Sequence, residues 1–142
     1  MRIPPILAVM LLAGCGQAEP PEIAIHDAWA RATNSADGPA AAYLTISNQG
    51  GEDRLLSVRS GQAASASLHS SGVRNGIMEM RPLPEGVAIA AHGDTLLSPA
   101  GTHIMLERVG PLHPGDRLQL SLRFEKSGDM VVPVSVVAPG SR

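Results

Sequence analysis

From Glu22 onward, apolar and polar positions alternate with a period of two rather than 3.6. The stretch "DRLQLSLRFE" (116–125) shows this best, because every second residue from Leu118 to Phe124 is apolar. Such alternation predicts a β-strand with one face turned to a core. The same pattern predicts further strands in "AAYLTIS" (41–47), "ASASLHS" (64–70), "THIMLERV" (102–109) and "MVVPVSVV" (130–137).

Turn sequences separate these runs and fix the fold class. "NQGGED", "RNG", "HGD", "HPGD" and "KSGD" each offer Gly with Asn or Asp where a positive φ is needed. The chain beyond the N-terminus shows no helical period. We therefore expect one all-β domain, an antiparallel Greek-key β-sandwich of seven to nine strands. Pro133 cannot donate to a ladder, so its strand is expected at an edge or with a bulge.

The N-terminus resembles a bacterial lipoprotein signal. "MRIPPILAVMLLAGC" has one Arg, an apolar stretch and small residues before Cys15, and its ending is similar to a lipobox. Cys15 is the only cysteine, and lipidation would account for a lone thiol in an exported protein. The expected organisation is a signal peptide at 1–14, the lipidated Cys15 with a tether at 15–21, the domain at 22–138 and a tail at 139–142. A plain signal peptide with an incidental cysteine is the alternative.

The composition of the chain excludes several classes of function. With 142 residues and a net charge of -2, the chain has room for one domain and lacks the basic field that nucleic acid requires. It has only three aromatic side chains for stacking bases or sugars, namely Trp29, Tyr43 and Phe124. It contains no H-E-x-x-H, C-x-x-C or G-x-S-x-G. We expect a protein that is not an enzyme and that binds no nucleic acid.

The stretch "GTHIML" (101–106) carries the candidate chemistry. Alternation turns Ile104 and Leu106 to the core, so His103 and Met105 are expected together on the outer face. A thioether on a polar face has no evident packing reason. His69 also falls on the polar side of its strand, and "GIMEM" adds two methionines, Met78 and Met80. Two imidazoles with two thioethers favour Cu(I), because soft sulfur ligands select it over Zn(II) or Mg(II).

Five segments together resemble the periplasmic copper chaperones of the PCu(A)C family: "HDAWARAT", "AAYLTISNQG", "LHSSGVRNGIMEMRPL", "LLSPAGTHIMLERV" and "LHPGDRLQLSLRFEKSG". The family motif has a His or Met, ten residues, a Met, and then a distant His-x-Met. His69 and Met80 match its first half, and His103 with Met105 match the second. The 22 residues between Met80 and His103 are one more than the family spacing, which a loop would absorb. The resemblance spans about residues 22 to 137.

The resemblance implies a cupredoxin-like domain that carries Cu(I) outside the cytoplasm. It implies delivery toward the CuA centre in subunit II of cytochrome c oxidase, beside a Sco-type thioredoxin-like partner. We expect the chain to contact the membrane through the lipid anchor alone, and the resemblance favours the outer membrane because Gly16 offers no inner-membrane retention signal. Copper homeostasis or resistance and a metal-free adhesion or assembly module are the alternatives. An electron-transfer cupredoxin is disfavoured, because it would need a cysteine thiolate in the site.

The remaining candidates receive structural roles. Met78 is expected to pack near the site, and Glu107 is a candidate hydrogen-bond acceptor for His103. Trp29 and Arg31 match the family's "WAR" segment and are expected to make packing and strand-end contacts. The other histidines, which are His26, His92 and His113, lack a methionine at ligand spacing. His92 and His113 lie in Gly-Asp turns and are expected at the surface.

Overall fold

The computed structural model describes residues 16–142, and every regular element in that range is a β-strand. The predicted signal peptide and Cys15 lie outside the described residues. Within residues 16–142, no helix is long and apolar enough to cross a membrane. The strands are β1 (Ile23–Arg31), β2 (Ala40–Asn48), β3 (Asp53–Arg59), β4 (Ser65–Arg74), β5 (Ile77–Pro82), β6 (Val87–Ile89), β7 (Gly93–Leu97), β8 (Thr102–Glu107), β9 (Arg117–Phe124) and β10 (Gly128–Val137).

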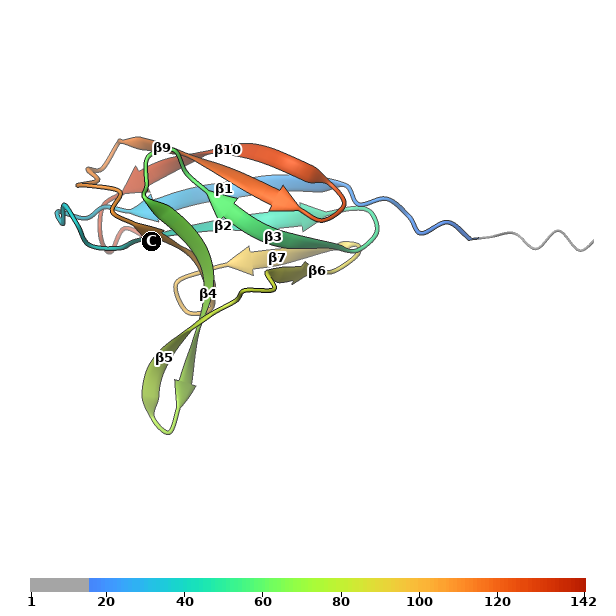
Figure 1. The fold of residues 1–142 in the computed structure, drawn as a ribbon, viewed down its shortest axis with the longest axis horizontal. Helices are drawn as coiled ribbons and strands as arrows, with labels where there is room; N and C mark the ends of the chain where they lie inside the picture. Colours follow the sequence, from blue (N-terminus) through green and yellow to red (C-terminus); the bar gives the residue numbers. More distant parts are fainter. Residues whose placement is uncertain (1–15) are drawn as a thin grey trace, which may run out of the picture.

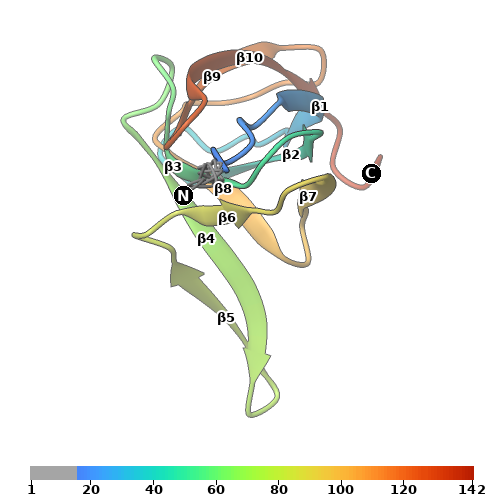
Figure 2. The same cartoon turned by 90° about the vertical axis from the view of Figure 1, so that its right-hand side faces the viewer.

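The ten strands form one hydrogen-bonded sheet in the order β5-β4-β8-β2-β1-β10-β9-β3-β6, with β7 also paired to β2. All pairs are antiparallel except β1 with β10. The sheet folds over on itself, so that β9 and β10 lie across the core from β2, β7 and β8 (Figures 1 and 2). The all-β prediction is confirmed, with one strand more than the upper number expected.

The alternation read from the sequence sets the core. Each apolar position of "DRLQLSLRFE" is buried, and so are Ile104 and Leu106 of β8. The core cluster also takes the alternating apolar residues of β2 and β10, which are Ala40, Ala42, Leu44, Ile46, Val132, Val134 and Val136. Burial of each Leu, Ile, Val or Phe side chain contributes about 1.5 to 3 kcal/mol, so this face of these strands is strongly specified.

Pro133 is not on an edge strand, because β10 lies between β1 and β9. The prediction was wrong for a physical reason that the register supplies. Pairing of β10 with β1 starts only at Ser135, so at Pro133 the ladder continues on the β9 side alone, opposite Gln119. The strand therefore has a local edge at Pro133, where a missing N–H is tolerated.

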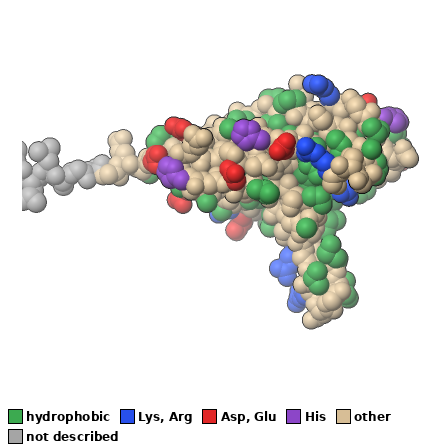
Figure 3. Space-filling view, turned by 180° about the vertical axis from the view of Figure 1, so that it is seen from behind, with side chains coloured by type: hydrophobic (Ala, Val, Ile, Leu, Met, Phe, Trp, Pro, Cys, Tyr) green, Lys and Arg blue, Asp and Glu red, His purple; other side chains and the backbone are tan. Residues whose placement is uncertain are grey.

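The β4–β5 hairpin projects from the body of the domain (Figures 1 and 2). Its two-residue turn is Asn75-Gly76, with φ of 52° and 76°. Both values are positive, as a type I′ turn requires, and Asn-Gly is the favoured sequence for it. Its outer part carries four exposed apolar side chains, Val73, Ile77, Met78 and Met80. Hydrophobic atoms accordingly show on the projection in the space-filling view (Figure 3).

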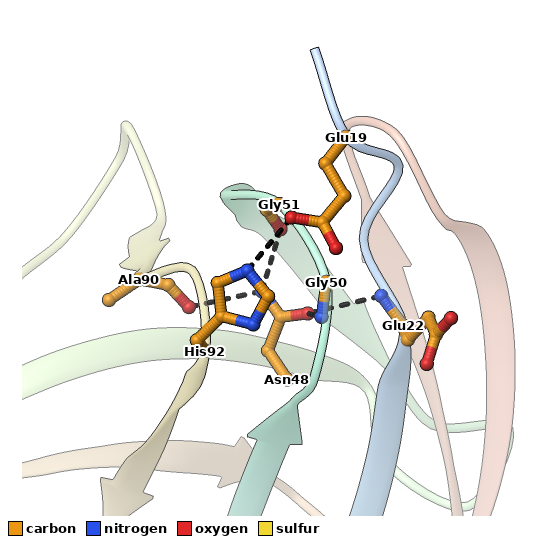
Figure 4. Close-up of polar contacts among 7 residues, drawn as sticks. All are labelled: Glu19, Glu22, Asn48, Gly50, Gly51, Ala90 and His92. Atoms are coloured by element: carbon orange, nitrogen blue, oxygen red, sulfur yellow. Dashed lines mark hydrogen bonds and ion pairs between the residues drawn. The ribbon is translucent and has the colours of Figure 1, made fainter.

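Asn48, at the end of β2, organises a second turn in the opposite way, through buried polar contacts (Figure 4). Its Oδ1 accepts hydrogen bonds from the N–H groups of Glu22 and Gly50, at 3.1 and 3.0 Å. Its Nδ2 donates to the carbonyls of Gly51 and Ala90, at 2.7 and 3.0 Å. One buried amide thus joins the chain entry, the β2–β3 turn and the segment before β7.

The last part of the predicted tether is docked against this turn. The Gly51 N–H donates to the Pro20 carbonyl at 3.1 Å, and the Glu19 carboxylate lies 2.8 Å from Nε2 of His92 (Figure 4). A Cβ on Gly51 would overlap the Glu19 carbonyl oxygen, so only glycine permits this approach. The chain therefore meets the domain at Glu19, before β1 begins.

Candidate metal centre

The outer face of the sheet carries a row of aromatic and imidazole rings that crosses four strands. Trp29 on β1 pairs with Tyr43 on β2, and His103 on β8 pairs with His69 on β4. The pairing of Ala42 with Ile104 brings Tyr43 opposite His103. Ring centroids are separated by 4.5, 6.4 and 6.1 Å along the row. The row therefore ends in two stacked imidazoles.

His69 and His103, predicted as ligands from segments far apart in sequence, are thus direct neighbours. Their rings are nearly parallel, with 20° between planes. His103 is only 3% exposed, whereas His69 is half-buried. The Oγ of Ser67 lies 3.4 Å from Nδ1 of His69, a long contact. His103 is therefore the fixed member of the pair, and His69 faces solvent more.

A backbone carbonyl orients the His103 ring. Its Nδ1 lies 3.1 Å from the oxygen of Gly101, which can only accept, so Nδ1 carries the proton. In the neutral ring this leaves the lone pair on Nε2, which is the form a metal ligand needs. The prediction that Glu107 accepts from His103 was wrong. Glu107 is exposed at the end of β8, four residues along the strand, while the turn before β8 brings Gly101 within reach.

Met105 lies beside His103 on the same face and pairs with Ala41 on β2 and Ser67 on β4. It is 9% exposed, and with His103 it forms a buried patch. The predicted face is correct, but the expectation that this face is solvated was wrong. A strand in the middle of a sheet is flanked on both sides, and the neighbouring side chains of Tyr43 and His69 cover what alternation alone would leave in water.

Met80, the fourth predicted ligand, stands apart from the other three. It pairs with Ser71 on β4, while His69 pairs with Pro82, so Met80 is the diagonal neighbour of His69. Diagonal partners on one face are about 7 to 8 Å apart, within reach of a long side chain. Met80 is 56% exposed on the projecting hairpin, and Met105 lies on the other diagonal of His69. Three of the predicted ligands, His69, His103 and Met105, are therefore direct or diagonal neighbours on β4 and β8, whereas Met80 lies on the exposed hairpin beside them.

Met78 does not pack near the site, contrary to prediction. It pairs with Val73, two positions beyond Met80 on the same face of the hairpin, and is 69% exposed. The hairpin extends past the body of the domain, so no second layer reaches Met78 to bury it (Figure 1). Met130, by comparison, packs against the core cluster.

The structural roles expected for Trp29 and Arg31 are confirmed. Trp29 packs on Tyr43, and the Arg31 guanidinium lies 6.0 Å from the centroid of the same ring. Tyr43 itself is buried and meets His103, a contact that sequence reasoning missed because alternation does not give the register between strands. The two histidines expected at the surface, His92 and His113, are exposed, and so is His26.

This arrangement suits a soft metal ion. Across residues 16–142, no three side chains of His, Cys, Asp or Glu come together as metal ligands. The donors that lie together here are two imidazoles and the Met105 thioether, and neutral sulfur and nitrogen donors favour Cu(I). All four predicted ligands lie on one face of adjacent strands, so a bend of the hairpin toward β8 would bring Met80 to the rest.

Comparison with known proteins shows the family to which the chain belongs. A family model described as "Putative lipoprotein LpqE-like" matches residues 23–136. The chain belongs to the LpqE-like lipoprotein family. It is also 32% identical over 116 residues to "Putative lipoprotein Lxx21020" of Leifsonia xyli subsp. xyli, covering 80% of this chain and 69% of that protein. The family match begins at the first residue of β1 and ends one residue before the end of β10.

Solved structures similar to this chain are PCuAC domains. The apo PCuAC domain from PmoF1 has a TM-score of 0.66 at 26% identity, covering 81% of this chain and 92% of that one. The copper-bound domain from PmoF2 has the same TM-score at 24% identity, with 82% and 93% covered. CuI-DR1885 from Deinococcus radiodurans has a TM-score of 0.60 at 25% identity, with 80% and 76% covered. The predicted resemblance to the PCu(A)C family and its cupredoxin-like fold are confirmed.

Proposed function

We propose that this lipoprotein is a Cu(I) carrier that holds one ion through His69, Met80, His103 and Met105. The observation that carries the proposal is the stacked pair His69 and His103, with Met105 beside it and Met80 on the adjacent hairpin strand. Similarity to a PCuAC domain with copper and to CuI-DR1885 supports the choice of metal. The protein works by binding and ligand exchange and catalyses no reaction.

The site's burial suits a carrier that must retain its ion and still release it. His103 and Met105 are enclosed by the sheet, so their side chains lose little freedom when copper binds. Met80 and His69 are more exposed and can be replaced first by the ligands of an acceptor. Thioethers and imidazoles of an acceptor would substitute one at a time, so the metal is never stripped of all ligands.

The destination follows from the family resemblance. We propose delivery toward the CuA centre in subunit II of cytochrome c oxidase, with a Sco-type thioredoxin-like partner, from the periplasmic side of a membrane to which Cys15 anchors the chain. Any acceptor with soft ligands would suit the same chemistry, so copper homeostasis is the competing destination. Assay of CuA assembly in a deletion strain distinguishes the two, because only an oxidase chaperone would lower oxidase activity at ordinary copper supply.

Copper binding is tested by anaerobic competition of the detergent-solubilised protein against a Cu(I) chelator. N-ethylmaleimide treatment removes any contribution from a free Cys15 thiol, the only thiol in the chain. We expect one equivalent, weakened at least about tenfold by Met80→Leu, since each lost ligand removes more than about 1.4 kcal/mol. Met80 is exposed, so this variant should fold. Met130→Leu, a thioether packed on the core, is the matched control.

The proposal fails if the wild-type protein retains no copper. It also fails if Met80→Leu and the double variant His103→Ala with Met105→Leu retain copper as tightly as Met130→Leu.

A further inference from the structure

The exposure of two methionines on one side of the β4–β5 hairpin has no packing explanation. Met78 and Met80 are 69% and 56% exposed, and neither belongs to the core cluster or its partly buried margin. Exposing a large apolar side chain in water forfeits about 1.5 to 3 kcal/mol that its burial would contribute. Since burial does not explain a methionine at either position, the sulfur atom is the feature of these side chains left to account for them.

The register shows that the two thioethers form part of one surface with the metal centre. Met78, Met80 and Pro82 of β5 pair with Val73, Ser71 and His69 of β4, and paired residues share a face. Successive residues on that face are about 6.8 Å apart along the strand. Two flexible thioether side chains at that separation can reach one ion between them. The thioethers of Met80 and Met78 therefore lie at increasing distance from His69, and each is close enough to the next ligand for a metal ion to pass between them.

Charge separates the two faces of the hairpin. The face with His69 and the methionines carries no charged residue, whereas Arg74, Glu79 and Arg81 alternate onto the other face. Figure 3 shows basic side chains on the same projection as the apolar ones. A cation approaching along the methionine face therefore avoids the guanidinium groups and meets neutral sulfur ligands.

We propose that Met78 and Met80 form a second, outer Cu(I) position, through which the ion enters and leaves the four-ligand centre. This rests on the proposed function. Cu(I) binds the Met78 sulfur as a bond to an inner ligand breaks, Met80 belongs to both positions, and copper keeps its charge throughout. Two thioethers alone hold the ion more weakly than the inner set. The outer position therefore fills during transfer, as Met80 releases the inner ion, or above one equivalent, when the two lone pairs of the Met80 sulfur bridge the two ions. Its partner ligands come from the copper donor or acceptor.

Methionine-methyl NMR of the detergent-solubilised protein tests the outer position directly, with Cu(I) as the probe. The first equivalent should shift the methyl resonances of Met80 and Met105. The second equivalent should shift that of Met78, while Met130, packed on the core, serves as the unmoved internal reference. The proposal is overturned if the Met78 resonance stays as constant as that of Met130 up to two equivalents.

Transfer kinetics provide the second arm. We expect Met78→Leu to leave equilibrium competition for the first equivalent within about twofold of wild type, and to slow transfer to a Cu(I) chelator by about fivefold or more, because the route of exit changes. Val73→Leu alters the exposed residue opposite Met78 without adding or removing sulfur and should leave both unchanged. Transfer from Met78→Leu at the wild-type rate overturns the outer position and leaves the proposed function intact. Failure of the wild-type protein to hold any copper removes both.

Discussion

The β4–β5 hairpin and the Asn48 turn are both tight turns between strands, yet they are held by opposite means. Asn48 is buried and makes four hydrogen bonds to backbone groups of three segments. The hairpin turn is specified by its own Asn75-Gly76 backbone and leaves its outer side chains in solvent. A buried polar junction is costly to break, whereas an exposed hairpin can bend and exchange ligands at little cost. Stability and metal handling are thereby placed in different regions.

The largest expected effect on stability is at Asn48. Asn48→Ala leaves backbone N–H and carbonyl groups of Gly50, Gly51 and Ala90 without their partner in a partly buried place. We expect the free energy of unfolding to fall by about 2 to 4 kcal/mol, since each unsatisfied group costs about 1 to 3 kcal/mol and water relieves part of this. Chemical denaturation measures it. Gln49→Ala, at the exposed neighbour, should change stability by less than about 0.5 kcal/mol.

If Asn48→Ala weakens copper retention as much as it weakens folding, the separation between the two regions is wrong.

A methyl group at Gly51 should release the docked entry segment. Gly51→Ala would push its Cβ into the Glu19 carbonyl, so the segment must move away or the turn must shift. We expect the free energy of unfolding to fall by about 1 to 3 kcal/mol, the usual range when a side chain is forced into a packed place. Faster exchange of the residue-51 amide, which donates to the Pro20 carbonyl in the wild-type protein, would report it. Gly61→Ala is the matched control, because nothing lies within 4 Å of its Cβ position and its φ is ordinary. Equal behaviour of the two alanine variants would contradict the docking.

Asp53, at the start of β3 beside the Asn48 turn, makes the stability of the fold depend on pH. Burial raises the pKa of this carboxyl, but hydrogen bonds from the Ser127 hydroxyl and from the N–H groups of Lys126, Arg54 and Ser127 outweigh it and lower the pKa below its ordinary value. A lowered pKa stabilises the folded state above the unfolded-state pKa, and that stability disappears as pH falls through the folded-state pKa.

We therefore expect the free energy of unfolding to fall by about 1 to 2 kcal/mol in Asp53→Asn at pH 7, because a neutral amide oxygen accepts these hydrogen bonds more weakly than a carboxylate does. The difference from wild type should begin to shrink as pH falls below about 4, where the carboxyl protonates in the unfolded chain, and should shrink further as pH approaches the lowered folded-state pKa. Denaturation curves from pH 7 to pH 3 measure both. A difference that stays constant over that range would show that the charge of Asp53 contributes nothing.

The smallest stability effect is expected at the tip of the hairpin. Val73→Ser with Ile77→Ser replaces two exposed apolar side chains outside the core cluster. The free energy of unfolding should change by less than about 0.5 kcal/mol, because surface positions contribute little. A loss above about 1.5 kcal/mol would mean that the hairpin folds onto the body in solution and that its exposure is not the resting arrangement.

The sequence specified the core and the ligand faces well, because period-two alternation records which side of a strand avoids water. Leu118 to Phe124 and the pair Ile104 and Leu106 are buried as predicted. Burial of His103 and Met105 could not be predicted, because it depends on which strands flank β8. Pairing register likewise decides that Gly101, not Glu107, meets His103. These are contacts between distant segments, and local periodicity carries no information about them.

The exposed state of Met78 was missed for a related reason. A "GIMEM" run looks apolar, and an apolar run near a site is expected to pack. Only the length of the β4–β5 hairpin beyond its last neighbour, β8, shows that nothing is available to pack against. The docked segment at Glu19 was hidden in the same way, because Pro-rich composition resembles a free tether whether or not a Gly-Gly turn receives it.

The most direct test of the central claim is X-ray absorption at the copper edge of the protein loaded anaerobically with one equivalent of Cu(I). The four-ligand centre predicts a shell with two imidazole nitrogens and two sulfurs, the sulfur contribution halving in Met80→Leu and disappearing in Met80→Leu with Met105→Leu. It also predicts an unchanged spectrum for Met130→Leu. A spectrum with nitrogen and oxygen ligands alone, or a sulfur contribution that survives loss of both Met80 and Met105, would contradict the site.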